Sequence, residues 1–184
     1  MGIEVFLGEP PQHIKEWIIN NSKPAGNPKT KITFTDGTSQ EYDWSGKITY
    51  RTMKDAGLAE NNAWIKQPQT VEIGTNVTSI GNYTFEDCSS LTSVTIPDSV
   101  TSIGDYAFNG CERMKSVTIG NGVTSIGYRV FTGCSSLTSV TFSGKDKATV
   151  TGIGTDTEIT YPWSLASGCV IHCTDGDITI QAKE

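Results

Sequence analysis

A 23-residue repeat dominates the middle of this chain. The segment VTIPDSVTSIGDYAFNGC begins at Val94, and similar segments begin 23 residues earlier, at Val71, and 23 residues later, at Val117. Apolar residues recur at the same positions of the copies: Val71, Val94, Val117 and Val140; Ile73, Ile96, Ile119 and Phe142; Val77, Val100 and Val123; Ile80, Ile103 and Ile126; Phe85, Phe108 and Phe131; Leu91, Met114 and Leu137. This self-similarity predicts a solenoid, because one such unit cannot bury its own apolar face and must stack on its neighbours.

Each repeat predicts a short strand, a turn and a second extended segment. Residues 91–96, LTSVTI, alternate as a strand does, with Ser93 and Thr95 on the outer side. After a Pro-Asp or Gly-Asn turn, VTSIG is expected to be extended, and residues 105–111 are expected to form one helical turn closed by Gly110. The glycine of each VTSIG segment is expected at a backbone bend that a side chain would obstruct: Gly81, Gly104 and Gly127.

The middle copy of the repeat, SVTIPDSVTSIGDYAFNGCERM, resembles the BspA-type leucine-rich repeat, which is found in bacterial surface proteins and their relatives. The resemblance extends over residues 71–142. It departs from the commoner leucine-rich pattern in using Val, Ile and Cys where other repeats use Leu and Asn. The resemblance implies a curved, right-handed solenoid that serves in binding rather than in catalysis.

Residues 1–70 lie outside the repeat and predict a small α+β unit. PPQHIKEWIIN predicts a helix with Pro11 near its first turn, and Asp36-Gly37 predicts a two-residue hairpin turn. A second helix is expected over residues 49–56, where Gly57 stops it. This unit is expected to cap the first coil or to anchor the protein. The part from VFLGEPPQHIKEWI through DGTSQEYDWSG also resembles segments that precede such repeats in predicted virion proteins of bacteriophages from gut bacteria.

The period breaks after Phe142, and residues 143–184 are expected to form a C-terminal cap. Within them, CVIHCTDGDITI predicts a final β-hairpin around Asp175-Gly176. The expected fold class is therefore α+β: a short right-handed leucine-rich-repeat solenoid of three to three-and-a-half repeats, between a small N-terminal α+β capping unit and a C-terminal β-hairpin cap.

Charge and hydropathy exclude two classes of partner. The formal net charge of the 184-residue chain is −6, and its Lys and Arg residues form no cluster, so a nucleic-acid partner is not expected. Apolar runs extend over only a few residues, far short of the ~20 that span a bilayer, so membrane insertion is not expected. The start, MGIEVFLGEPPQHIKEW, lacks the basic residues and the cleavage site of a signal peptide.

Cysteines recur at one position of the repeat: Cys88, Cys111 and Cys134. In stacked coils their Cα atoms lie about 4.8 Å apart with parallel side chains, which does not suit a disulfide, and no His accompanies them to complete a zinc site. They are expected to be reduced packing residues. Cys169 and Cys173 would lie roughly 13 Å apart on a strand, with His172 on the opposite face. No metal and no other cofactor is expected.

No residue of the sequence is a candidate for catalysis. His13 and His172 are the two histidines of the chain, and His13 lies in the predicted helix without a nucleophile motif nearby. The serines occupy repeat positions rather than a Gly-x-Ser-x-Gly elbow. An enzyme is therefore the least favoured class of protein.

The remaining candidates are surface residues. The outward strand positions form a neutral stripe of hydroxyls that could hydrogen-bond a glycan or a peptide backbone, although the same residues could simply be the polar filling of a solvated strand face: Ser93, Ser116 and Ser139; Thr95, Thr118 and Thr141. Between copies the framework is constant, and the residues that vary are candidates for specificity: Asp98, Asp105, Glu112, Arg113, Lys115, Tyr128 and Arg129. Aromatic residues concentrate in residues 1–70 and are candidates for assembly or anchoring: Trp17, Tyr42, Trp44, Tyr50 and Trp64.

The sequence thus favours a non-catalytic interaction protein that presents a repeat surface to a protein or a glycan. A structural role as a decoration or fibre protein of a bacteriophage virion is the alternative. The protein is expected outside the cell, on a bacterial surface or a virion, with the N-terminal unit joining it to a second copy or to a larger assembly.

Overall fold

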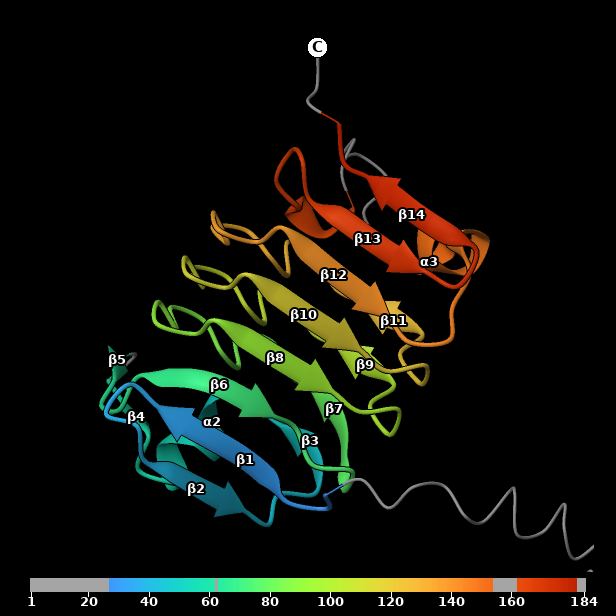
Figure 1. The fold of residues 1–184 in the computed structure, drawn as a ribbon. Helices are drawn as coiled ribbons and strands as arrows, with labels where there is room; N and C mark the ends of the chain where they lie inside the picture. The colour runs from blue at the N-terminus through green and yellow to red at the C-terminus, as the bar shows by residue number, and fades with distance from the viewer. Residues whose placement is uncertain (1–26, 62, 154–161, 182–184) are drawn as a thin grey trace, which may run out of the picture.

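The computed structural model describes residues 27–61, 63–153 and 162–181. These residues form a short β-solenoid with few helices, in which two sheets face each other across an apolar interior (Figure 1). The helix predicted from Pro11 onward lies outside the described residues. None of the described helices is long and apolar enough to cross a membrane.

The larger sheet has eight strands in the order β14-β13-β12-β10-β8-β6-β1-β2 (Figure 1). Its central strands are parallel, and an antiparallel hairpin lies at each end, β1 with β2 and β13 with β14. The strands are β1 (Thr30–Phe34), β2 (Ser39–Tyr42), β6 (Pro68–Glu72), β8 (Ser93–Ile96), β10 (Ser116–Ile119), β12 (Ser139–Phe142), β13 (Val170–Cys173) and β14 (Gly176–Thr179).

The smaller sheet has four parallel strands in the order β11-β9-β7-β3 and lies behind the larger one in Figure 1. The remaining elements are a two-stranded hairpin, two short helices and one 3-10 turn. Their bounds are β3 (Gly46–Ile48), β7 (Val77–Ile80), β9 (Ser102–Ile103), β11 (Ser125–Ile126), β4 (Ala59–Glu60), β5 (Ala63–Trp64), α2 (Tyr50–Asp55), α3 (Lys147–Gly152) and a 3-10 helix (Pro162–Ser164).

The 23-residue period sets the register of the parallel strands. Val94 of β8 lies beside Val71 of β6 on one side and Val117 of β10 on the other, and Val117 lies beside Val140 of β12. Each residue therefore lies beside its equivalent in the next copy, which confirms the stacking predicted from the sequence.

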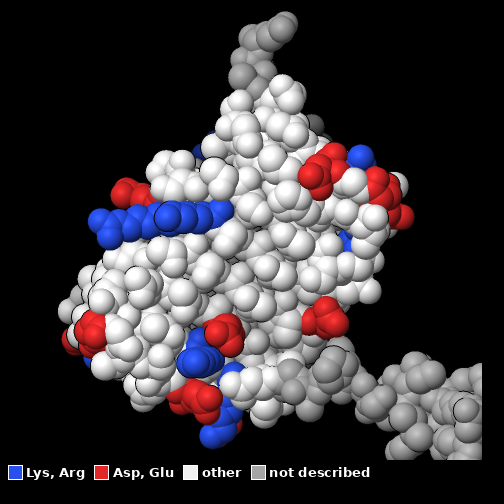
Figure 2. All heavy atoms as spheres, viewed as in Figure 1, with Lys and Arg blue, Asp and Glu red and all other residues white. Residues whose placement is uncertain are grey.

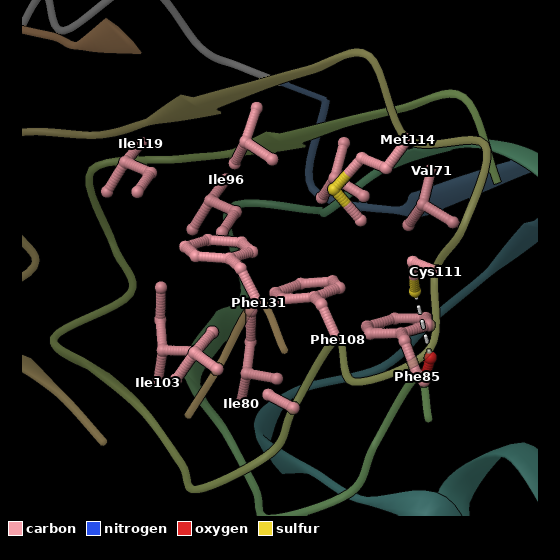
Figure 3. Close-up of a cluster of buried hydrophobic side chains, with 14 of the residues drawn as sticks. Val71, Ile80, Phe85, Ile96, Ile103, Phe108, Cys111, Met114, Ile119 and Phe131 are labelled. Carbon is pink, nitrogen blue, oxygen red and sulfur yellow. Dashed lines mark hydrogen bonds between the residues drawn. The ribbon is translucent and has the colours of Figure 1, made fainter. Parts of the chain in front are cut away.

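Three phenylalanines form the centre of the interior, as Figure 3 shows. Phe108 stacks between Phe85 and Phe131, with ring centroids 5.3 Å and 5.9 Å apart, and all three side chains are buried. The Sγ of Cys111 donates a hydrogen bond to the carbonyl oxygen of Phe85 over 3.2 Å, drawn as a dashed line in Figure 3. The cysteine column thus packs in the interior and also bonds one coil to the coil before it.

Two tryptophans close the ends of this interior. Trp64 stacks on Phe85, with ring centroids 6.2 Å apart. At the other end, the backbone N–H of Phe131 donates to the carbonyl oxygen of Trp163 (3.1 Å), whose side chain is fully buried. In the repeats the same bond runs to the next coil, so the 3-10 helix that contains Trp163 takes the place of a further coil.

The helical turn predicted over residues 105–111 is wrong. This segment is a series of turns, because Tyr106 (φ 54°) and Gly110 (φ 72°) adopt the left-handed conformation. The N–H groups of Tyr106 and Phe108 donate to the next coil, to the carbonyl oxygens of Tyr128 (2.9 Å) and Val130 (3.1 Å). The N–H groups of Ala107, Asn109 and Cys111 make local bonds to the residue three positions earlier, so bonds within the turns alternate with bonds between coils.

The glycines of the VTSIG segments lie where a side chain would be obstructed, as expected. A Cβ on Gly104 would collide with the backbone of Asn82 in the preceding coil, and a Cβ on Gly127 would collide with the backbone of Asp105. The close approach of successive coils therefore excludes a side chain at these two positions.

The N-terminal predictions that fall on described residues hold with one change. Helix α2 is confirmed: Thr49 caps it in a capping box with Thr52, and it ends before Gly57 (φ 71°). The hairpin at Asp36-Gly37 is confirmed, but the N–H of Phe34 donates to the carbonyl oxygen of Thr38 (2.8 Å), so three residues rather than two form the loop. The C-terminal hairpin is confirmed as β13 and β14.

Strand β6 spans Pro68–Glu72, so the boundary expected between residues 70 and 71 falls within a strand of the larger sheet. The N-terminal strands also continue both sheets, since β1 pairs with β6 and β3 pairs with β7. The division of the chain into a capping unit, repeats and a C-terminal cap stays a prediction.

Candidate functional site

The outer face of the larger sheet has a row of hydroxyl side chains. The strand register places one Ser or Thr on each of six neighbouring strands, from β2 to β12: Ser39, Thr33, Thr70, Ser93, Ser116 and Ser139. Adjacent strands lie about 4.8 Å apart, so hydroxyls recur at about that interval. Each hydroxyl can donate one hydrogen bond and accept two. The row can therefore bond a partner that offers both donors and acceptors.

A second row runs beside the first and differs along its length. Its middle positions, on β8, β10 and β12, are threonines, whereas its two ends are charged or titratable: Glu41, Lys31, Glu72, Thr95, Thr118, Thr141, His172 and Asp177. Figure 2 shows the same face, in which charged side chains lie toward the rim and the centre is uncharged. We call the outer surface of β6, β8, β10 and β12 the hydroxyl face.

The sequence analysis identified the part of these rows that lies in the repeats. Ser93, Thr95, Ser116 and Thr118 come together as expected, with Thr95 exposed and the other three half-buried. Thr33, Ser39 and Thr70 were missed because they precede the repeats. The alternation in KITFT and the polar residues of SQEY are the signals that could have revealed them.

Two carboxylates that are predicted to contact a ligand also bond neighbouring coils, and their contact with a ligand stays a prediction. The Oδ1 of Asp98 accepts a hydrogen bond from the N–H of Asn121 (2.7 Å), and the Oδ1 of Asp105 accepts one from the N–H of Tyr128 (2.8 Å). Both bonds join residues 23 apart. Residues that vary between copies therefore also help to hold successive coils together.

The other variable residues lie apart from the hydroxyl face. Arg129 is exposed, and its guanidinium lies 4.9 Å from the ring centroid of Tyr128, on the turns that follow β11. Glu112, Arg113 and Lys115 are exposed on the segment that leads into β10. The variable residues thus lie on more than one segment of the coil.

The N-terminal aromatic residues pack inside the molecule where the structure describes them. Tyr42 is 9% exposed and stacks on Trp44, with ring centroids 4.6 Å apart. The indole N–H of Trp64 donates to the carbonyl oxygen of Glu86 (2.8 Å). Tyr50 is half-buried against the same core. Trp17 lies outside the described residues, and an assembly role for this group stays a prediction.

Thiols and histidine do not converge. Cys169 is buried, burial raises its pKa to about 11, and His172 points to the opposite face of β13, where its Nδ1 lies 2.9 Å from the Oδ1 of Asp177. Within the described part of the chain, no group of three or more His, Cys, Asp or Glu residues could hold a metal ion.

Stacked 23-residue coils with parallel strands in two facing sheets define a solenoid, and the repeat sequence assigns it to the leucine-rich-repeat class. The profile of the family described as "BspA type Leucine rich repeat region (6 copies)" matches residues 63–157, which is just over half of the 184 residues. The chain belongs to this family. Membership supports a repeat-based interaction protein.

Solved structures show partial similarity. The T. pallidum Leucine Rich Repeat protein (TpLRR) is 25% identical and has a TM-score of 0.40, and the match covers 46% of this chain and 45% of that one. A leucine rich cell surface protein from Faecalibacterium prausnitzii A2-165 is 30% identical with a TM-score of 0.32, covering 62% of this chain and 30% of that one. This chain thus spans less than half the length of either. A search of curated proteins found no match.

Proposed function

We propose that this protein is a non-catalytic interaction protein that binds a protein or a glycan through the hydroxyl face. The observation that carries the proposal is the registered row of Ser and Thr side chains on an exposed, centrally uncharged sheet. A regular array of neutral hydroxyls matches ligands whose own donors and acceptors repeat, such as a polysaccharide or an extended peptide backbone.

The setting that we propose is attachment at a bacterial cell surface. Membership in the BspA-type family supports it, because such repeats occur in bacterial surface proteins. The alternative is a decoration or fibre protein of a bacteriophage virion, which the resemblance of the N-terminal sequence to predicted virion proteins supports. Both settings use the same face for binding and need no catalytic residue.

Replacing the threonines of the hydroxyl face tests the proposal. The triple variant Thr95→Val, Thr118→Val, Thr141→Val removes three hydroxyls at nearly constant volume, and valine suits a strand. The control, Thr78→Val, Thr101→Val, Thr124→Val, removes a column with the same 23-residue spacing, which begins in β7 of the smaller sheet. The hydroxyls of Thr101 and Thr124 donate to carbonyl oxygens of the preceding coil, so this control should lose some stability but no binding.

Binding is measured on glycan arrays and on intact bacterial cells. We expect the face variant to lose binding at least about tenfold, the factor that corresponds to one or two hydrogen bonds, while the control binds like the parent chain. Equal binding by both variants, or conversion of a bound ligand to a product, would rule the proposal out. Thermal melts confirm that both variants fold.

We further propose that residues 1–70 attach the protein to a second copy or to a larger assembly. An aromatic residue at an interface contributes more binding energy than most other residues, and residues 1–70 contain three of the four Trp residues of the chain. Light scattering compares the full chain with Trp17→Ala, and we expect the variant to be smaller. A monomeric full chain that joins no particle or anchor protein would reject this attachment.

A further inference from the structure

A pocket lies beside the first repeat coil, where helix α2 meets the turn after β7. Its volume is about 410 Å³, and the described residues that line it are Tyr50, Asn82, Tyr83, Glu86 and Asp87. This volume lies within the usual range for small-molecule sites, roughly 300 to 1,000 Å³. None of the five residues belongs to the hydroxyl face.

The pocket lies where the N-terminal part stops following the path of a repeat coil. The N–H of Gly104 donates to the carbonyl oxygen of Ile80, and the N–H of Gly81 donates in the same way to Ile48 of β3, over 2.8 Å and 2.7 Å. β3 therefore takes the place of a preceding coil up to Ile48. At Thr49 the chain instead enters helix α2. Helix α2 thus stands where a repeat coil would have the turns that pack on the turns at Tyr83. This replacement leaves space beside Tyr83.

A row of tyrosines ends at this pocket. The ring of Tyr83 stacks on Tyr106 at a centroid distance of 5.3 Å, and Tyr106 meets Tyr128 edge-on at 5.6 Å. Tyr106 covers one face of the Tyr83 ring, and Tyr83, which lines the pocket, remains 44% exposed. The hydroxyl of Tyr50 is buried and has no hydrogen-bond partner among the described residues. The pocket thus offers an aromatic surface and an unused polar group.

The charges of the pocket are negative. Glu86 and Asp87 bring two carboxylates to it, and no Lys or Arg is among its described lining residues. The Oε1 of Glu86 accepts a hydrogen bond from the side chain of Asn109 (3.0 Å), which fixes the orientation of this carboxylate. Carboxylates next to an aromatic ring stabilise a cation both by charge and by the quadrupole of the ring.

The far end of the same tyrosine row already holds a cation. The guanidinium of Arg129 lies over Tyr128, 4.9 Å from its ring centroid. Arg129 is the repeat equivalent of Tyr106, so the protein fills that end of the row with its own positive charge. At the Tyr83 end, the corresponding place is the pocket.

We infer that this pocket binds an organic cation, an ammonium or guanidinium group, between Tyr83 and the carboxylates of Glu86 and Asp87. The cation could belong to a small molecule such as a quaternary amine or to a Lys or Arg side chain of a partner protein. A neutral sugar would also stack on tyrosine, but it would leave the two carboxylates without a counter-charge.

Titrations of the full chain, followed by ¹H–¹⁵N NMR at constant ionic strength, test the inference. The probes are choline, its neutral isostere 3,3-dimethyl-1-butanol, the N-acetyl methylamides of lysine and arginine, and methyl glucoside. We expect a cationic probe to shift the amide signals of Tyr83, Glu86 and Asp87, and the neutral probes to leave them unchanged. Choline alone would indicate a small-molecule ligand, and the lysine or arginine probe would indicate a side chain of a partner.

Variants separate the contribution of the ring from that of the charge. Tyr83→Leu and Asp87→Asn should each weaken cation binding about tenfold, whereas Tyr83→Phe, which keeps the ring, should bind like the parent chain. Asn tolerates the left-handed backbone of residue 87 (φ 56°). Glu112→Gln, an exposed carboxylate outside the pocket, is the control. Binding of the neutral isostere equal to that of choline, binding of the sugar alone, or no shift with any probe would overturn the inference. The hydroxyl-face proposal would be unaffected, since it uses other residues.

Discussion

The thiol of Cys134 donates a hydrogen bond to the carbonyl oxygen of Phe108, 3.2 Å away in the preceding coil. Cys111 makes the equivalent bond to Phe85, so the cysteine column fixes the spacing of successive coils. Burial raises the pKa of Cys88 and of Cys111, and hydrogen bonding with Cys111 together with burial raises that of Cys134. These thiols remain protonated in the folded protein.

We predict that the three thiols of the column are reduced and do not react in the native state. Titration with a thiol reagent at pH 8 should label Cys173, which is half-buried, and should reach Cys88, Cys111 and Cys134 only on unfolding. Because the folded pKa values are raised, stability should fall as the pH rises above the ordinary thiol value of 9.0, where the unfolded thiols ionise. Rapid labelling of the column, or a disulfide within it, contradicts this assignment.

The central phenylalanine should contribute strongly to stability. Phe108 is fully buried between two other rings, so Phe108→Ala should lower the free energy of unfolding by about 3 to 5 kcal/mol. Ile65→Ala, at a side chain that is 61% exposed, is the control and should cost less than about 0.5 kcal/mol. Denaturant melts measure both values. A loss below about 1 kcal/mol for Phe108→Ala would mean that the stacking register is wrong.

The hydrogen bond that Asp105 makes between coils should contribute measurably to the free energy of unfolding. Asp105→Ala removes the acceptor of the Tyr128 N–H, and we expect a loss of about 1 kcal/mol. Glu112→Ala, an exposed carboxylate, should change the stability by less than about 0.5 kcal/mol in the same denaturant melts. Equal stability of the two variants would show that the hydrogen bond of Asp105 does not stabilise the stack of coils. The prediction that Asp105 contacts a ligand would then be favoured.

The turn of the N-terminal hairpin should lower the pKa of one carboxyl, that of Asp36. The side-chain hydroxyl of Thr38 (2.6 Å) and then its backbone N–H (2.9 Å) donate to Asp36 and hold the pKa of Asp36 below its ordinary value of 3.8. This contribution to stability is present above pH 3.8 and is lost as the pH falls through the lower, folded pKa. NMR titration should show a higher pKa for Asp36 in Thr38→Ala and no change in Thr35→Ala. An unchanged pKa in Thr38→Ala would show that the hydroxyl is not the cause.

The solenoid could be predicted because a strict period leaves few alternatives. Once Val71, Val94 and Val117 share a position, stacking in register follows, and the positions of Phe108 and Cys111 follow with it. The turns after Gly104 could not be predicted. A tyrosine at position 106 has no preference for the left-handed conformation, in which its N–H donates to the next coil.

The candidate sites required information that no local pattern contains. Thr33 and Ser39 join the hydroxyl row only because β1 pairs with β6, a contact between segments about 40 residues apart. The pocket at Tyr83 depends on the residue at which helix α2 leaves the stack, and nothing near Tyr83 in the sequence signals that point. Aromatic residues such as Trp64 were visible, but the sequence left open whether they pack on the first coil or on a partner.

The 23-residue register also sets the kinetics of assembly. Bonds between coils, such as that from the N–H of Thr101 to the carbonyl oxygen of Thr78, close loops of 23 residues, about one-eighth of the 184-residue chain. A shorter loop costs less conformational entropy to close than a longer one. The bond from the N–H of Gly74 to the Oγ1 of Thr30 instead closes 44 residues. Folding of the solenoid should therefore start among the repeats, and β1 should join the sheet last.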